Sequence, residues 1–428
     1  MSTTLPQSED AAGDGSGASE VAASSDPPDV PVAEDRLRLT PTDRWLALVV
    51  AVVGLPIIWM GYGVDIDVAN VLDTTELIRD GDYMPSRTPG VPVFEAVAAL
   101  LDPVGGHLLL NLATLAAAVA MIVGIAQLVR AWGHDNDDLL ALAFFASPIT
   151  IISSTGVADF VWALAFFVWG AVLHLRGRGR GLATGVLFAL ALGSRLSTGF
   201  LVAAFLVADG WDLAHRRRCL RTAVLALPLG AMLYVPSWLA FDRTLRFLEN
   251  TEGYRSFGNN LGRFVYKSYA TAGPILLVVL LVAVPALVVA LRRWGGDPML
   301  RFAVLGFAIT QGLFFMMPWK AAHLLPSLLA LVLWIGASAR NRRPYLWVLV
   351  AALAVNGLFS LRLLTPDQPG AARGGQWDPA LGAGFLVNEI RCRLEYMDDR
   401  PQAYQEEGWA CSLKPMRGTV PPGADADS

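Results

Sequence analysis

Apolar runs long enough to cross a bilayer recur along this chain from residue 46 to residue 363. Hydrophobic residues make up 54% of the sequence and charged residues only 16%, which is typical of proteins embedded in lipid. Because lipid offers no hydrogen-bond partners, a spanning segment must pair its backbone amides within the protein. The runs are continuous and lack the alternating polarity of barrel strands. The sequence therefore predicts an all-α, polytopic membrane protein.

The apolar runs divide into about eleven expected spans. They cover residues 46–64, 106–129, 138–153, 158–175, 181–193, 197–210, 220–240, 273–291, 301–317, 322–338 and 345–363. The pair at 181–193 and 197–210 is short, so it predicts either a hairpin that crosses only part of the bilayer or two tilted helices.

Arginines mark one side of this arrangement. Fourteen of them lie in five short connections that all fall on the same side of an eleven-span bundle, whereas the opposite turns 154–157 and 194–196 hold one arginine between them. Positive residues in short loops are retained in the cytoplasm. We therefore expect a multi-pass protein of the plasma membrane, with its N-terminus in the cytoplasm and its C-terminus outside.

The chain is expected to have three parts. Residues 1–43 carry eight acids before Arg36 and are rich in small residues and proline, which predicts a disordered acidic cytoplasmic tail. Residues 44–363 form the transmembrane domain, with large exterior loops at 65–105 and 242–272. Residues 364–428 form a small exterior tail.

The three cysteines contain no CxxC pair, so the sequence predicts no metal cluster. Cys219 lies among arginines at a membrane edge and is expected to be a free thiol. Cys392 and Cys411 lie in the tail, where an oxidising compartment would allow them to form a disulfide.

The first exterior loop concentrates charge directly after an apolar span. Its acids are Asp65, Asp67, Asp73, Glu76, Asp80 and Asp82. Asp65 and Asp67 lie at the membrane edge, where they could act as a general base or as ligands of Mg²⁺ or Mn²⁺. The alternative is that these two aspartates only mark the water boundary of a helix. Residues 91–101 are apolar but too short to span, which predicts a helix lying in the membrane interface.

Three motifs accompany these acids. Gly81-Asp82-Tyr83 and Ser86-Arg87-Thr88-Pro89-Gly90 follow in the same loop, Gly193-Ser194-Arg195 lies at the apex of the short hairpin, and Trp319-Lys320-Ala321-Ala322-His323-Leu324-Leu325-Pro326 opens a late span. In order and sidedness they resemble the GT-C superfamily of membrane glycosyltransferases, most closely the protein-mannosyltransferase and aminoarabinose-transferase type. The resemblance implies a GT-C-like fold and transfer of a sugar from a polyprenyl-phosphate donor at the outer face.

By this resemblance the catalytic base is Asp67 or Asp65, and the spacing to the Gly81 turn favours Asp67. The base would deprotonate an acceptor hydroxyl on a glycan, a glycolipid or a protein, and transfer would invert the anomeric centre. No cofactor is required by the resemblance, although a divalent cation at Asp65 and Asp67 is a candidate.

The departing lipid phosphate needs positive charge, and a planar guanidinium matches its oxygens. The donor phosphate-binding candidates are Arg87, Arg195, Lys320, Arg255, Arg263 and Lys267. Snorkelling arginines and interfacial Trp-Lys anchors are the alternative interpretation. Supporting roles are assigned to Asp159, Glu95, His323 and Tyr83, with Asp159 either pairing with Arg195 or capping its helix.

The expected partners are the bilayer, the polyprenyl-phosphate donor and the acceptor, with no nucleic acid. A transporter or lipid flippase is the alternative function. It would place charges inside the spans, where we find almost none except Arg195, and it often shows matched, broken spans in two halves, which are absent from the sequence.

Overall fold

The computed structural model describes residues 39–63, 66–177, 181–248, 256–318, 321–339, 342–364 and 378–395. These residues belong to one compact unit that begins at Leu39. The N-terminal tail and four residues singled out from the sequence, Asp65, Arg255, Lys320 and Cys411, lie outside the described residues.

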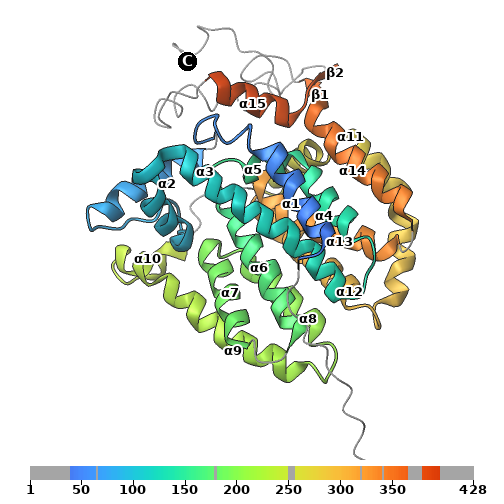
Figure 1. Cartoon of the computed structure of the whole chain (residues 1–428), viewed down its shortest axis with the longest axis horizontal. Coiled ribbons are helices and arrows are strands. Elements are labelled where there is room, and N and C mark those ends of the chain that lie inside the picture. Colours follow the sequence, from blue (N-terminus) through green and yellow to red (C-terminus); the bar gives the residue numbers. More distant parts are fainter. Residues whose placement is uncertain are drawn as a thin grey trace, which may run out of the picture. The chain divides into compact units, whose positions relative to one another are not determined.

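Helices account for most of the described chain (Figure 1). In the first half they are α1 (Pro41–Gly54), α2 (Ile66–Arg79), α3 (Pro92–Ala131), α4 (Asp137–Ala146), α5 (Pro148–Ser154), α6 (Asp159–Arg176), α7 (Gly181–Ser194) and α8 (Thr198–Asp209). In the second half they are α9 (Arg216–Leu233), α10 (Val235–Ala240), α11 (Phe257–Ala290), α12 (Pro298–Met316), α13 (Leu325–Ser338), α14 (Arg343–Leu358) and α15 (Phe385–Glu395). Short 3₁₀ helices occur at η1 (Leu245–Leu248), η2 (Leu291–Arg293) and η3 (Ala321–Leu324).

Within the described residues, five helical stretches are long and apolar enough to cross a membrane: 92–131, 159–176, 271–293, 298–316 and 321–338. The helices α4 and α5, which meet at 79°, count as a sixth stretch if they form one broken span. Three more expected spans appear as the shorter apolar helices α7, α8 and α14. The polytopic helical architecture is therefore present, whereas five or six helices, and not eleven, meet the length of a full span.

Helix breaks fall where glycine and proline interrupt the apolar pattern. Gly105 and Gly106 leave helical geometry inside α3, with Gly106 at φ 53°, so the predicted boundary between 91–101 and 106–129 is present as a kink. The first helix ends at Gly54, short of the predicted residue 64, and Pro56 follows, which cannot donate the hydrogen bond that would continue a helix.

The expected exterior loop 242–272 is only partly a loop. The helix α11 begins at Phe257, where the side chain of Ser256 accepts a hydrogen bond from the backbone N–H of Asn259. This N-cap satisfies one of the donors that a helix start leaves open. The helix then bends at Gly273, whose φ of 69° favours a residue without a side chain. Arg263 and Lys267 consequently project from a helix and not from an extended loop.

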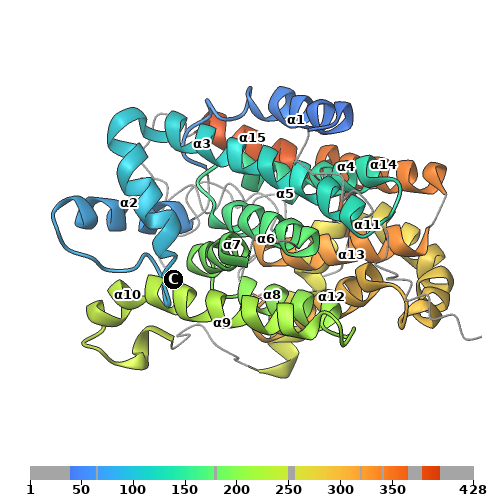
Figure 2. The same cartoon turned by 60° about the horizontal axis from the view of Figure 1, so that its bottom comes forward.

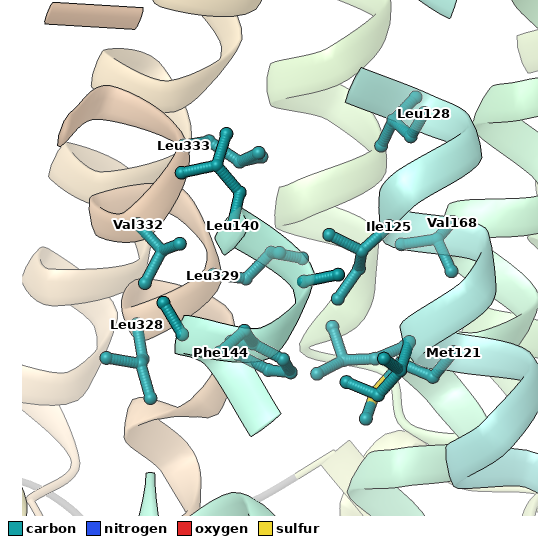
Figure 3. Close-up of a cluster of buried hydrophobic side chains, with 14 of the residues drawn as sticks. Met121, Ile125, Leu128, Leu140, Phe144, Val168, Leu328, Leu329, Val332 and Leu333 are labelled. Carbon is teal, nitrogen blue, oxygen red and sulfur yellow. The ribbon is translucent and has the colours of Figure 1, made fainter. Parts of the chain in front are cut away.

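The core is formed where α3, α4, α6 and α13 meet. Figure 3 shows side chains of these helices directed toward one another, among them Met121, Leu140, Phe144, Val168 and Leu329. All five are almost completely buried. Between helices in lipid such contacts stabilise through dispersion and close packing, since lipid tails are as apolar as the side chains. This core fixes the positions of the helix ends that carry the charged residues.

The C-terminal part departs from the all-α expectation. The strands β1 (Phe359–Leu364) and β2 (Asp378–Ala383) pair antiparallel, from Phe359 opposite Ala383 to Leu364 opposite Asp378. The following helix α15 packs against α5 and α14 (Figure 1). Its buried Arg393 donates to the carbonyl of Thr155 at 2.8 Å, and Cys392 beside it is buried and disulfide-bonded. The tail therefore supports the segment that leads into α6.

Candidate functional site

Arg87 joins two carboxylates at one end of the helical bundle. It lies in the segment between α2 and α3, and its Nη1 contacts the carboxylate of Asp67 on α2. Its Nη2 lies 2.7 Å from Oδ1 of Asp159, the first residue of α6. The Asp159 side chain is 6% exposed, whereas Asp67 and Arg87 are 18% and 21% exposed. The bridge thus runs from a buried carboxylate to one that water or a substrate can reach.

Arg195 holds the other oxygen of the same buried carboxylate. Its Nη1 donates to Oδ2 of Asp159 at 2.7 Å, and its Nη2 lies 2.7 Å from Nε2 of His323 on η3. Because arginine can only donate, His323 Nε2 accepts and the imidazole proton resides on Nδ1. The guanidinium carbon lies 3.4 Å from the ring centroid of Phe160, a favourable cation–π position.

We call Asp67, Arg87, Asp159, Arg195 and His323 the charge cluster. Its members come from five separate chain segments: α2, the α2–α3 segment, α6, the α7–α8 connection and η3. The two carboxylates balance the two guanidinium groups, which is the condition for keeping charge away from water. The Nε atom of Arg195 is buried and has no hydrogen-bond partner among the described residues. This donor is therefore not used by the described part of the cluster.

The turn that presents Arg87 is held by Glu95 on the first turn of α3. This fully buried carboxylate accepts hydrogen bonds from the Tyr83 hydroxyl at 2.7 Å, the Ser86 hydroxyl at 2.6 Å and the Ser86 N–H at 2.9 Å. Burial raises the pKa of Tyr83, so its hydroxyl keeps its proton and continues to donate. Glu95 and Tyr83, expected only as supporting residues, therefore position the Arg87 turn.

Close packing against α10 fixes the same turn from the other side. The Tyr83 hydroxyl lies 3.2 Å from the Ser237 hydroxyl, and Gly90 has a φ of 99°. A Cβ atom at Gly90 would lie 2.8 Å from the Ser237 hydroxyl, which real structures do not tolerate. Figures 1 and 2 both show α2 and α10 at the same end of the bundle. Only glycine fits where the turn meets α10.

Substituting Glu95 with glutamine should loosen this turn. The amide presents only one acceptor oxygen to three donors, and we expect a loss of about 1–3 kcal/mol of stability, with weaker binding of any ligand of Arg87. Thermal unfolding of the purified protein checks the first effect. Glu76→Gln, at an exposed position on α2, is the matched control and should shift stability by less than about 0.5 kcal/mol. Equal thermal stability of the Glu95→Gln and Glu76→Gln variants would contradict a positioning role for Glu95.

The other sequence-predicted residues divide into two groups. Asp65, Arg255 and Lys320 lie outside the described residues. Arg263 and Lys267 lie on α11, which packs against η3, the carrier of His323. Their contact with a donor phosphate stays a prediction.

Three participants were missed from the sequence. Phe160 directly follows Asp159 and is an aromatic partner that its position could have suggested. Ser86 belongs to the recognised turn but was not assigned a contact. Ser237 offers no sequence signal, because it lies more than 140 residues from the turn it supports.

A divalent cation is the cofactor candidate from the sequence. Mg²⁺ and Mn²⁺ favour several free carboxylate or carbonyl oxygens. In the described part of the cluster, Asp67 already contacts one guanidinium group and Asp159 contacts two. These residues are arranged around arginine and not around a cation, so we derive no step through a metal. Asp65 lies outside the described residues, and a role for it with a cation stays a prediction.

No family model and no curated protein matches the chain. Among solved structures, ArnT from Cupriavidus metallidurans bound to undecaprenyl phosphate superposes with a TM-score of 0.52 at 15% identity, covering 71% of this chain. The chain has the fold of ArnT. The structure of ArnT from Cupriavidus metallidurans in the apo state gives a TM-score of 0.48 at 16% identity, covering 72% of this chain.

The chain covers 60% of the length of undecaprenyl-phosphate-bound ArnT. The resemblance to GT-C membrane glycosyltransferases, predicted from the first-loop motifs, is thus confirmed for the fold. An ArnT-like fold together with the apolar helices identifies a membrane protein of this architecture.

Proposed function

We propose that this chain is an integral-membrane glycosyltransferase that moves a monosaccharide from a polyprenyl-phosphate donor to an acceptor hydroxyl at the exterior face. The observation that carries the proposal is the charge cluster, in which a partly exposed carboxylate and two arginines converge at one end of an ArnT-like helical bundle. Glycosyl transfer from a lipid phosphate needs these two functions, a base for the acceptor and positive charge for the leaving phosphate.

In the proposed step, the Asp67 carboxylate takes the proton of the acceptor hydroxyl while the oxygen of that hydroxyl attacks the anomeric carbon of the donor sugar. The bond between that carbon and the phosphate oxygen breaks from the opposite side, so the configuration is inverted. The leaving polyprenyl phosphate keeps the electron pair and gains one negative charge. Arg87 and the open Nε of Arg195 stabilise this developing charge, since charge-assisted hydrogen bonds to phosphate are stronger than neutral ones.

The pairing of Arg87 with Asp67 gives this step an order. While the guanidinium contacts Asp67, the carboxylate is a poor base because its negative charge is already compensated. A donor phosphate that draws Arg87 toward itself frees Asp67 for the acceptor. Donor binding would therefore activate the base. If Asp65 is the base instead, Asp67 serves only to hold Arg87 in place.

Sidedness supports an exterior site. The arginine-rich connections lie at the ends of helices opposite to the charge cluster, as at Arg176, which ends the helix that Asp159 begins. The disulfide-bonded Cys392 lies on α15, which contacts the segment leading to Asp159 through Arg393. Disulfides persist in oxidising compartments, which agrees with an exterior C-terminus. The eleven-span topology belongs to the same proposal, with the shorter helices completing the spans.

A transporter or lipid flippase remains the alternative function. Carriers place ionisable residues near the bilayer midplane. The charge cluster instead lies at helix ends: Asp159 begins α6, and Arg195 directly follows α7. This placement favours surface chemistry over transport.

Binding of undecaprenyl phosphate by the purified chain in nanodiscs tests the proposal. Arg87→Gln removes the guanidinium, and we expect the affinity to fall roughly 10- to 100-fold, the effect of losing a charge-assisted hydrogen bond of about 1.5–3 kcal/mol. Arg79→Gln, at an exposed arginine of α2, is the control and should bind as the unmodified protein does. If both variants bind equally, Arg87 is not the phosphate ligand. Movement of labelled lipid across the bilayer without sugar transfer would favour the flippase.

A further inference from the structure

A second cluster of reactive side chains lies at the other end of α6. His174 is fifteen residues after Asp159 on the same helix, so it lies roughly 22 Å along the helix axis from the charge cluster. Asp209 is the last residue of α8, and Cys219 lies on the first turn of α9. The helix α8 packs against both α6 and α9, which brings the three residues together.

The distances among these side chains suit a metal ion. His174 Nε2 lies 3.0 Å from Asp209 Oδ2, Cys219 Sγ lies 3.3 Å from the same oxygen, and Sγ lies 3.7 Å from Nε2. Ligands bound to zinc at about 2.0–2.3 Å with tetrahedral angles stand roughly 3.3–3.7 Å apart. The triangle of nitrogen, oxygen and sulfur therefore already has nearly the size of one face of such a site.

The surroundings of the triangle are those of a metal-bound histidine. His174 Nδ1 lies 3.1 Å from the Thr222 hydroxyl, so the nitrogen that faces away from the triangle has its own partner. Such an outer hydrogen bond fixes the tautomer of a metal ligand. His215, the residue before α9, places Nδ1 3.0 Å from Asp209 Oδ1, so it holds the carboxylate oxygen that lies outside the triangle. The three inner residues are buried, with exposed fractions of 2–7%.

The alternative is a hydrogen-bond network without metal. Arg218 lies on the rim, with Nη2 2.8 Å from Asp209 Oδ2, and it can neutralise this carboxylate by itself. In that arrangement His174, Cys219 and Arg218 all direct donors to one oxygen atom. One metal ion satisfies the same oxygen together with the sulfur and the nitrogen. Since 31% of the Arg218 side chain is exposed, its guanidinium can turn to water when a cation enters.

We propose that His174, Asp209 and Cys219 form a zinc site that ties the ends of α6, α8 and α9 together. Mixed nitrogen, sulfur and oxygen donors in tetrahedral arrangement select zinc over the hard cations. On binding, the Cys219 thiol releases its proton to water, and thiolate and carboxylate together balance the double positive charge of the ion. A water molecule would complete the tetrahedron, and because the three protein ligands are buried where three helix ends meet, the ion would hold these ends together. Under the predicted orientation it faces the cytoplasm.

Metal content of the full-length protein tests the site. The protein is purified from cells grown with added zinc, and zinc is quantified by mass spectrometry against protein. We expect one zinc per chain in the unmodified protein and loss of this zinc in Cys219→Ser. The matched control is His134→Gln, which alters a buried His–Asp pair with Asp297 at 3.2 Å that includes no thiol. The control variant should retain its zinc.

Two further measurements test the site if Cys219→Ser fails to fold: the spectrum of bound Co²⁺ and the zinc affinity of Thr222→Val. Co²⁺ added to the metal-free full chain should produce a thiolate-to-cobalt charge-transfer band and the visible bands of tetrahedral coordination. Thr222→Val keeps the shape of the side chain but removes the hydrogen bond to His174, and we expect zinc affinity to fall about 10- to 100-fold. Absence of zinc and of the cobalt–thiolate band in the folded, unmodified protein would show a hydrogen-bond network only and overturn the proposal.

Discussion

Replacement of Asp67 by asparagine is expected to abolish sugar transfer while leaving the protein folded. Asparagine has nearly the same shape but cannot take a proton from the acceptor, and the loss of a general base costs about 10²- to 10⁴-fold in rate. The Asp67 side chain is partly exposed, so water can solvate the asparagine amide and the Arg87 guanidinium after the substitution. Consumption of a polyprenyl-phosphate sugar donor in membranes carrying each variant measures the effect.

Asp67→Asn should affect donor binding in the opposite direction. In the free protein, Asp67 competes with the donor phosphate for Arg87. Removing its negative charge leaves the guanidinium to the phosphate, so undecaprenyl phosphate should bind at least as tightly as it does to the unmodified chain. Loss of transfer with retained or tighter binding separates a chemical role from a structural one.

The control for this experiment lies on the same helix. Asp73→Asn changes an exposed carboxylate of α2 and should leave both transfer and binding unchanged. Full transfer by Asp67→Asn would reassign the base to Asp65. Full transfer by Asp65→Asn as well would show that neither aspartate acts as the base, and the proposed step would be wrong.

Much of the helical framework follows from apolar periodicity and helix breakers. Continuous apolar residues predicted α6, α7 and α8 to within two residues at each end. Asp102-Pro103 predicted a break between the interfacial segment and the span that follows, and the structure has the kink just beyond it, at Gly105 and Gly106. These features depend on neighbours in the sequence, so local reasoning suffices for them.

The charge cluster was only partly predictable. The pairing of Asp159 with Arg195 was one of two interpretations of Asp159, and the structure contains that ion pair. The bridge from Arg87 to the same carboxylate was not foreseen, because it joins residues 72 positions apart on elements whose relative placement depends on the whole core. The resemblance supplied the candidates, whereas packing determined which of them touch.

The tail and the second cluster show where local reasoning fails. The strands at 359–364 and 378–383 pair with each other although fourteen positions separate the end of one from the start of the next, so no local pattern indicated the pairing. The absence of CxxC predicted no metal cluster, yet Cys219 meets a histidine 45 residues away and an aspartate 10 residues away. Ligands contributed by three helices leave no spacing motif in the sequence.

Removal of Asp159 is expected to produce a large loss of stability. This buried carboxylate contacts both Arg87 and Arg195, at 2.7 Å each. Asp159→Ala would leave Arg195 without this carboxylate partner and Arg87 with Asp67 alone, and breaking a buried ion pair by removing one partner costs about 3–5 kcal/mol. Thermal unfolding and the yield of monodisperse protein in detergent measure this effect.

A double-mutant cycle separates the ion pair from the packing of the side chain. Asp159→Asn keeps the shape and removes the charge, and Arg195→Gln removes the opposite charge. If the pair stabilises through charge compensation, the double variant should be less destabilised than the sum of the two single variants, with a coupling of about 0.5–3 kcal/mol. Additive effects would show that charge compensation between Asp159 and Arg195 does not stabilise the fold. The partly exposed pair of Arg343 and Asp138, at 2.6 Å, is the comparison cycle and should give less than about 1 kcal/mol, because water screens it.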